Sequence, residues 1–129
     1  MKNIAYWFHP GLKPYIGHES ELPFDQHFLK AMVAPRALLT TEALGDLWAN
    51  PTGTMLTHLA ARKVYRLLDA EPQLGIVFRE GEHRHGLEDW CVFLDFMAWR
   101  LCGKPAVRRY DENPFPAGAG GLLQVPAAP

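Results

Sequence analysis

Two short apolar runs most constrain the fold of this chain. Each run is followed by a polar loop and then by a longer amphipathic segment. Residues 37–44 (ALLTTEAL) and 74–80 (LGIVFRE) lack the strict polar–apolar alternation of half-exposed strands, which is typical of strands buried on both faces. Residues 54–70 and 87–103 carry apolar side chains three to four positions apart, the spacing of helices that cover a sheet. Because alternating strands and helices favour parallel pairing, the sequence predicts an α/β fold.

The segments outside these elements complete the expected organisation. Asp25 is placed to cap a short helix over residues 25–33, whereas residues 1–23 are rich in aromatic and turn-forming residues and predict an ordered loop. Residues 104–129 form a Pro/Gly/Ala-rich tail, which we expect to be mobile or loosely docked from residue 113 onward. The predicted division is therefore one folded segment over residues 1–103 and a tail over residues 104–129.

The small number of predicted strands indicates an incomplete sheet. Two strands leave backbone groups unpaired at both edges, and they expose apolar surface that a larger sheet would cover. We therefore expect this segment to belong to a larger α/β domain. Self-association through an exposed sheet edge is an alternative way to cover it.

The composition argues against two classes of partner. The chain has 13 basic and 14 acidic residues and no basic run, so a nucleic-acid partner has no electrostatic support. No stretch approaches about 18 consecutive apolar residues, so no membrane span is expected. The first residues, MKNIAYWFHP, lack the apolar core of a signal peptide, and the chain taken alone is expected to be soluble.

The single serine is poorly placed for catalysis. Ser20 lies in the polar sequence GHESELP, with no predicted strand before it and no Gly-x-Ser-x-Gly turn around it. A serine nucleophile is therefore not expected within these 129 residues.

Polar side chains follow both predicted strands. Asp46 comes after the first strand, and His83 and His85 come after the second. Because ligand and catalytic sites of open parallel sheets form at the carboxyl ends of the strands, these side chains are the candidate site. An acid followed by a histidine matches the order Ser…Asp/Glu…His of α/β-hydrolases, in which the histidine takes the proton of the nucleophile and the acid orients it.

The residues alone leave several interpretations of this site open. Gly81 lets the chain turn sharply just before His83, which favours His83 over His85 as a single catalytic base. Alternatively, the His-x-His pair and Asp46 could form a three-ligand zinc site, or both histidines could simply be solvated. Trp48 is either a loop-packing residue or a stacking wall for a ring-shaped ligand. The remaining histidines are expected to be structural or surface residues: His9, His18, His27 and His58.

Five stretches of the chain, spread over roughly residues 4–102, resemble the C-terminal part of bacterial glucuronoyl esterases, which are carbohydrate esterases of the α/β-hydrolase superfamily. They occur in the expected order and spacing. The stretches are YWF (6–8), LPFDQHFLKAMVAPRALL (22–39), DLWANPTG (46–53), AARKVY (60–65) and GEHRHGLEDWCVFLDF (81–96).

The resemblance implies a specific fold and activity. The fold would be the C-terminal portion of an α/β-hydrolase, with its last parallel strands and flanking helices. The activity would be that of a cofactor-free, serine-type carboxylic ester hydrolase that cleaves esters between glucuronate on xylan and the alcohols of lignin. Members of the family are usually secreted or periplasmic.

The resemblance also implies roles for individual residues. The family's Gly-x-His histidine falls on His83, and its glucuronate-contacting tryptophan falls on Trp48. The acid falls on Asp46, although some members use a glutamate earlier in the chain. The nucleophilic serine and an oxyanion-binding arginine would precede this region. We therefore expect a segment that is inactive alone, or alternatively a non-catalytic carbohydrate-binding or degenerate module.

Overall fold

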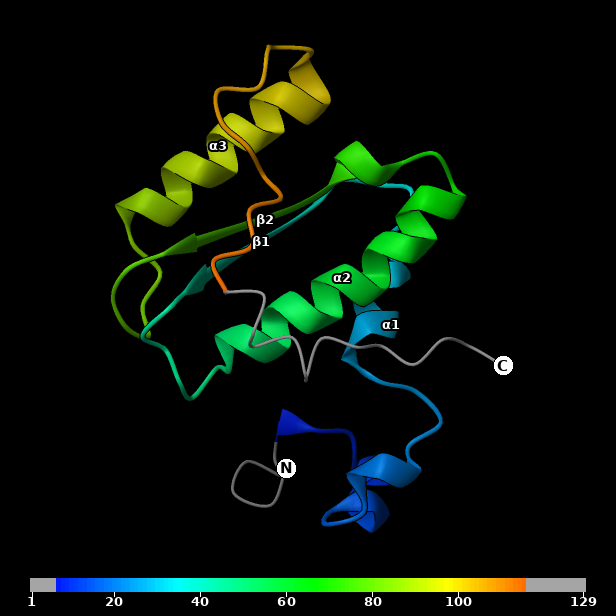
Figure 1. The fold of residues 1–129 in the computed structure, drawn as a ribbon. Helices are drawn as coiled ribbons and strands as arrows, with labels where there is room; N and C mark the ends of the chain where they lie inside the picture. The colour runs from blue at the N-terminus through cyan, green and yellow to red at the C-terminus, as the bar shows by residue number, and fades with distance from the viewer. Residues whose placement is uncertain (1–6, 116–129) are drawn as a thin grey trace.

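The computed structural model of the protein describes residues 7–115 and contains a small parallel sheet between helices (Figure 1). Strand β1 (Leu38–Ala43) pairs with strand β2 (Leu74–Arg79), with Leu38 opposite Leu74 and Ala43 opposite Arg79. Both strands lie within the predicted apolar runs and are parallel. The predicted α/β class is confirmed.

The two faces of the sheet are covered by different helices (Figure 1). Helices α1 (Gln26–Ala31) and α2 (Pro51–Leu67) lie on one face, and α3 (Leu87–Cys102) lies on the other. Short 3₁₀ helices, η2 (Pro10–Tyr15), η3 (Glu19–Glu21) and η4 (Glu71–Gln73), occur in the connections. Among the described residues, no helix is both long and apolar enough to cross a bilayer.

The helix ends follow local capping chemistry. The Asp25 side chain accepts a hydrogen bond from the Gln26 N–H, as the sequence predicts, and Gly103 ends α3 with φ 67°. The predicted start of the second helix at residue 54 is wrong by one turn. Asn50 caps the helix by accepting from the Gly53 N–H, and Pro51 occupies the first helical position, where a missing N–H costs nothing.

Alternate residues of the strands supply two separate cores. On the α2 face, Leu38 and Leu74 pack with Ala61 and Tyr65 of α2. On the α3 face, Leu39 and Val77 pack with a cluster that includes the fully buried Phe96. This two-sided burial explains why neither strand shows a polar–apolar alternation in the sequence.

The chain after α3 returns to the sheet. Tyr110 is buried against Phe96 and Trp99, and its carbonyl accepts a 2.7 Å hydrogen bond from the N–H of Ile76 in β2. The outer edge of β2 is thus partly covered, whereas β1 has no second strand partner within residues 7–115. The expected mobility beyond residue 113 falls almost entirely outside the described residues, and the division at residue 103 stays a prediction.

Candidate active site

The loops that follow β1 and β2 are joined by backbone contacts. The N–H of Leu44 donates to the carbonyl of Arg79, and the N–H of Gly45 donates to the carbonyl of Gly81, both at 2.9 Å. A Cβ on residue 45 would collide with the Gly81 carbonyl oxygen, so this approach requires glycine. Gly81 has φ 101°, which turns the chain off the strand. The contact brings the residues after Gly45 next to those after Gly81.

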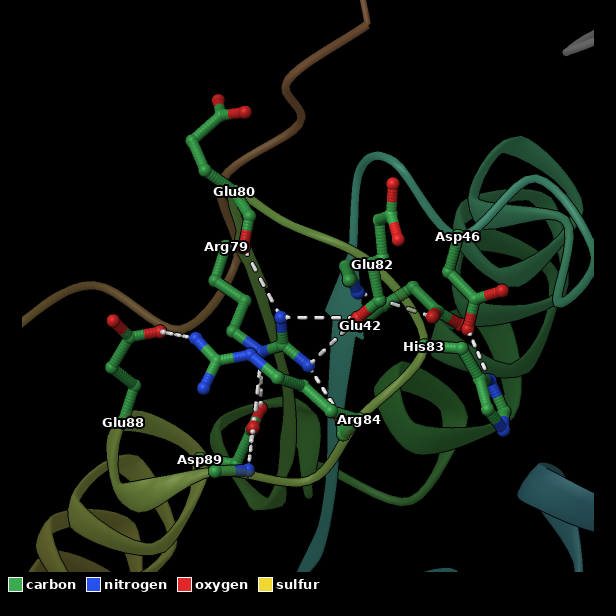
Figure 2. A network of polar contacts seen from close by, with 11 residues as sticks. Glu42, Asp46, Arg79, Glu80, Glu82, His83, Arg84, Glu88 and Asp89 are labelled. Atoms are coloured by element: carbon green, nitrogen blue, oxygen red, sulfur yellow. Dashed lines mark hydrogen bonds and ion pairs between the residues drawn. The ribbon is translucent and has the colours of Figure 1, made fainter.

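Asp46 and His83 meet at this junction (Figure 2). His83 Nδ1 lies 2.6 Å from Asp46 Oδ2, while Asp46 Oδ1 accepts a hydrogen bond from the Ala49 N–H. Asp46 is 7% exposed, whereas the His83 side chain is 70% exposed. The structure therefore pairs a buried carboxyl group with an accessible imidazole.

The electrostatics of the pair determine which ring nitrogen carries the proton. The hydrogen bond from His83 lowers the pKa of Asp46, and the Ala49 N–H and the positive charge of Arg79 add to this effect against the opposing effect of burial. An ionised carboxylate only accepts hydrogen bonds, so Nδ1 of His83 is the donor. Nε2 is then free to accept a proton. Among residues 7–115, no group hydrogen-bonds to Nε2.

Two tryptophans extend the surface beside this pair. The Trp48 ring meets the His83 ring edge-to-face, with centroids 5.4 Å apart, and Trp7 meets Trp48 in the same way at 6.1 Å. Trp7 and Trp48 are 62% and 66% exposed. Trp48 was a candidate from the sequence. Trp7 was not, because its only signal was its membership of the aromatic stretch at residues 6–8.

His85 does not join the site. Its ring packs edge-to-face on Trp90, with centroids 4.9 Å apart. In the described part of the chain, no group of three or more His, Cys, Asp or Glu side chains is arranged to hold a metal ion. The structure thus does not assemble the alternative zinc site from Asp46, His83 and His85. Ser20 is exposed in η3 and has no hydrogen bond to His83.

A residue that the sequence did not single out also lies at this junction. Arg79, the last residue of β2, forms an ion pair with Asp89 near the start of α3, with Nε 3.0 Å from Oδ2 (Figure 2). Burial alone would raise the pKa of Asp89, but hydrogen bonds from Gly86, Arg79 and Thr41 outweigh it and lower the pKa. An ionised Asp89 therefore faces a guanidinium that is itself only 12% exposed.

Known proteins match this chain over more than half of its length. A family model described as "Glucuronyl esterase, fungi" matches residues 1–69, a segment that contains Asp46 and Trp48. The chain belongs to the glucuronyl esterase family. This confirms the resemblance predicted from the sequence.

Individual glucuronyl esterases and related enzymes give consistent matches. A carbohydrate esterase from an unknown prokaryotic organism is 35% identical over 78% of this chain and 27% of its own length. A 4-O-methyl-glucuronoyl methylesterase of Wolfiporia cocos is 37% identical over 69% of this chain and 20% of its own length.

A solved structure extends the glucuronyl esterase match to the fold. The carbohydrate esterase family 15 glucuronoyl esterase from Caldicellulosiruptor kristjansonii is 38% identical, with a TM-score of 0.72, over 74% of this chain and 25% of that protein. The helices and parallel strands described above thus form part of an α/β-hydrolase fold. The chain spans between about a fifth and about a quarter of the length of these relatives.

Proposed function

We propose that this chain supplies the general base, its orienting acid and a sugar-binding wall to a serine-type glucuronoyl ester hydrolase. The observation that carries the proposal is the 2.6 Å contact between His83 Nδ1 and Asp46 Oδ2 at the carboxyl ends of β1 and β2. The names of the relatives support glucuronoyl esters as the substrate class.

His83 would act first as a base and then as an acid. Nε2 takes the hydroxyl proton of the nucleophile as its oxygen attacks the ester carbonyl, and it returns this proton to the departing alcohol oxygen. In the second half of the reaction, Nε2 takes a proton from water and gives it back to the nucleophile. Asp46 holds Nδ1–H and stabilises the imidazolium that forms in each step.

The nucleophile and the oxyanion-binding groups would come from a part of the complete enzyme outside this chain. The relatives are about four to five times as long as the segment that they share with this chain, which leaves room for both. Several large apolar side chains of the helices are exposed to solvent. Such exposure supports a further part of the enzyme that would cover them. The most exposed of these on α2 and α3 are Leu67, Leu87, Leu94 and Leu101.

A chimera tests this assignment. In the Caldicellulosiruptor kristjansonii esterase, the matching segment would be replaced by that of this chain, and hydrolysis of benzyl glucuronate would be measured. We expect the chimera to turn over this substrate. His83→Ala should lower kcat at least a thousandfold, whereas His85→Ala should change it by no more than about threefold. A folded chimera without turnover would overturn the proposal, as would turnover that survives His83→Ala.

A non-catalytic carbohydrate-binding role is the second candidate. It is favoured by the exposed ring of Trp48, which meets Trp7 edge-to-face and offers a stacking surface without any nucleophile. For the 129-residue chain alone, this role predicts quenching of tryptophan fluorescence by glucuronate that Trp48→Ala abolishes. The same chain would bind glucuronate but would not hydrolyse glucuronate esters. If the chimera turns over substrate but the chain alone does not bind glucuronate, this second role is excluded.

A further inference from the structure

The loop that carries His83 encloses the side chain of Arg79. Nη1 of Arg79 donates to the carbonyl of Glu80 at 3.1 Å and to that of Glu82 at 3.4 Å. Nη2 donates to the carbonyls of Glu82 and Arg84. Figure 2 shows the guanidinium at the centre of these contacts. One side chain thus binds three alternate carbonyls of the loop, including those of the residues on either side of His83.

Asp89 fixes the guanidinium and also closes the far end of the loop. Nε of Arg79 lies 3.1 and 3.0 Å from the two carboxylate oxygens of Asp89, and Oδ2 of Asp89 accepts a 2.8 Å hydrogen bond from the N–H of Gly86. Asp89 is 3% exposed and belongs to the first turn of α3. The loop between β2 and α3 is therefore tied at its start, its middle and its end to one buried ion pair.

His83 depends on such a backbone restraint. Its side chain is 70% exposed, so packing contacts do not fix its position. Its described contacts are the hydrogen bond to Asp46 and the edge-to-face contact with the Trp48 ring. Residues 80–86 contain no helix or strand that would hold their backbone. A hydrogen bond of 2.6 Å requires the two loops to keep their relative position to within a fraction of an ångström.

We propose that Arg79, anchored by Asp89, is a positioning residue that holds the His83 loop in the geometry needed for the contact with Asp46. This role rests on the proposed function of His83 as the base. Within residues 7–115, the hydrogen bonds and the ion pair of Arg79 go to loop carbonyls and to Asp89, so it would act through His83 and not on the substrate. Its positive charge also contributes to the lowered pKa of Asp46.

The alternative is that the ion pair only joins β2 to α3. Lysine separates the two roles. Arg79→Lys keeps the positive charge and can still pair with Asp89, but a single ammonium group cannot replace a planar fork that binds three carbonyls and a carboxylate at once. A purely structural ion pair tolerates this substitution, whereas a positioning role does not.

Nuclear magnetic resonance on the 129-residue chain tests the position of His83 without any catalysis. In the unsubstituted chain we expect a slowly exchanging Nδ1–H signal of His83 and cross-relaxation between the His83 and Trp48 rings. In Arg79→Lys both signals should fall at least fivefold, while the amide resonances of β1 and β2 keep their positions. Arg66→Lys is the matched control, because Arg66 forms a similar two-pronged contact with Glu71 at 2.8 Å, outside the site.

The outcomes separate the two roles. Unchanged His83 signals in Arg79→Lys would overturn the proposal. If this variant loses its strand resonances, Asp89→Asn becomes the test, because the amide keeps an oxygen for Gly86 but no longer anchors the guanidinium. Loss of the His83 signals with intact strands would then support the positioning role. Retained His83 signals, or unfolding of both variants, would overturn it.

A kinetic experiment on the chimera distinguishes failure of this inference from failure of the proposed function. Arg79→Lys should lower kcat about a hundredfold and change KM less than about twofold, because the misplaced base affects the chemical step. An inactive chimera, combined with the expected resonance changes, would reject the function and leave the positioning role standing. An active chimera whose kcat does not respond to Arg79→Lys would reject the positioning role alone.

Discussion

Two histidines of this chain occupy opposite surroundings. His58 lies on the buried face of α2, is fully inaccessible, and has no hydrogen-bond partner for either ring nitrogen within the described residues. His83 lies in an exposed loop, but its Nδ1 is held by the buried Asp46 carboxylate. The histidine assigned to catalysis under the proposed function is therefore the exposed one. The histidine suited to proton transfer is the one that combines an accessible nitrogen with a charged partner.

The buried histidine is held in its neutral form. Burial lowers the pKa of His58 to about 4, and the nearby positive charges of Lys30 and Arg62 add to this effect, whereas Asp111 opposes it. Among residues 7–115, this neutral imidazole has no hydrogen-bonded group with which to exchange a proton. His58 fits the structural role expected from the sequence.

Removing the charged partner of His83 should produce the largest effect. In the chimera, Asp46→Asn should lower kcat by about a thousandfold to ten-thousandfold, because an amide stabilises neither the donor state of Nδ1 nor the imidazolium. Steady-state kinetics with benzyl glucuronate would measure it, with Asp95→Asn, a change of the same kind on α3, as the control. A loss smaller than tenfold would assign the working acid to another carboxylate, such as a glutamate earlier in the complete enzyme.

Acid should unfold the chain through His58. The unfolded state has the ordinary histidine pKa of 6.5 and the folded state a pKa of about 4, so between these values the unfolded state binds more protons. The free energy of unfolding should therefore fall by about 3 kcal/mol as the pH drops through this window. Urea titrations at several pH values would measure the loss. A chain carrying His58→Leu should lose much less, and equal losses in both chains would refute this origin.

Replacing the buried imidazole should stabilise the chain at neutral pH. His58→Leu removes two buried nitrogens that lack partners and keeps a side chain of similar size, so the free energy of unfolding should rise by about 1–2 kcal/mol. Urea unfolding at pH 7 would show this as a higher midpoint with an unchanged slope. Met55→Leu, a volume-conserving change on the same buried face of α2, is the control. Destabilisation by His58→Leu alone would indicate a partner for His58 outside residues 7–115.

The sequence predicted the fold and the Asp46–His83 pair for the same reason. Residues buried on both faces of a strand must be apolar, which makes parallel strands visible as short runs. The carboxyl ends of neighbouring parallel strands lie at one edge, which brings the residues that follow them together. The start of α2 was missed because the prediction followed the apolar spacing from residue 54. The cap at Asn50, which has a left-handed backbone with φ 60°, lies before that point.

The Arg79 contacts could not be predicted in the same way. The three carbonyls that Arg79 binds are backbone groups, so their residue types carry no signal. Their convergence depends on the path of an irregular loop, which exists only after β2 and α3 have packed. Docking of Tyr110 was also hidden, because it depends on a single buried aromatic ring in the segment that follows α3.

The smallest expected effect concerns the stability contribution of His83. His83→Ala should change the free energy of unfolding by less than about 0.5 kcal/mol at pH 7, because the lost side chain is 70% exposed and makes few packing contacts. The same urea titration used for His58 would measure it, so the two histidines are compared in one assay. A change above about 1 kcal/mol would show that the Asp46–His83 pair holds the two loops together. The Arg79–Asp89 ion pair would then share, and not solely provide, the restraint on the loop.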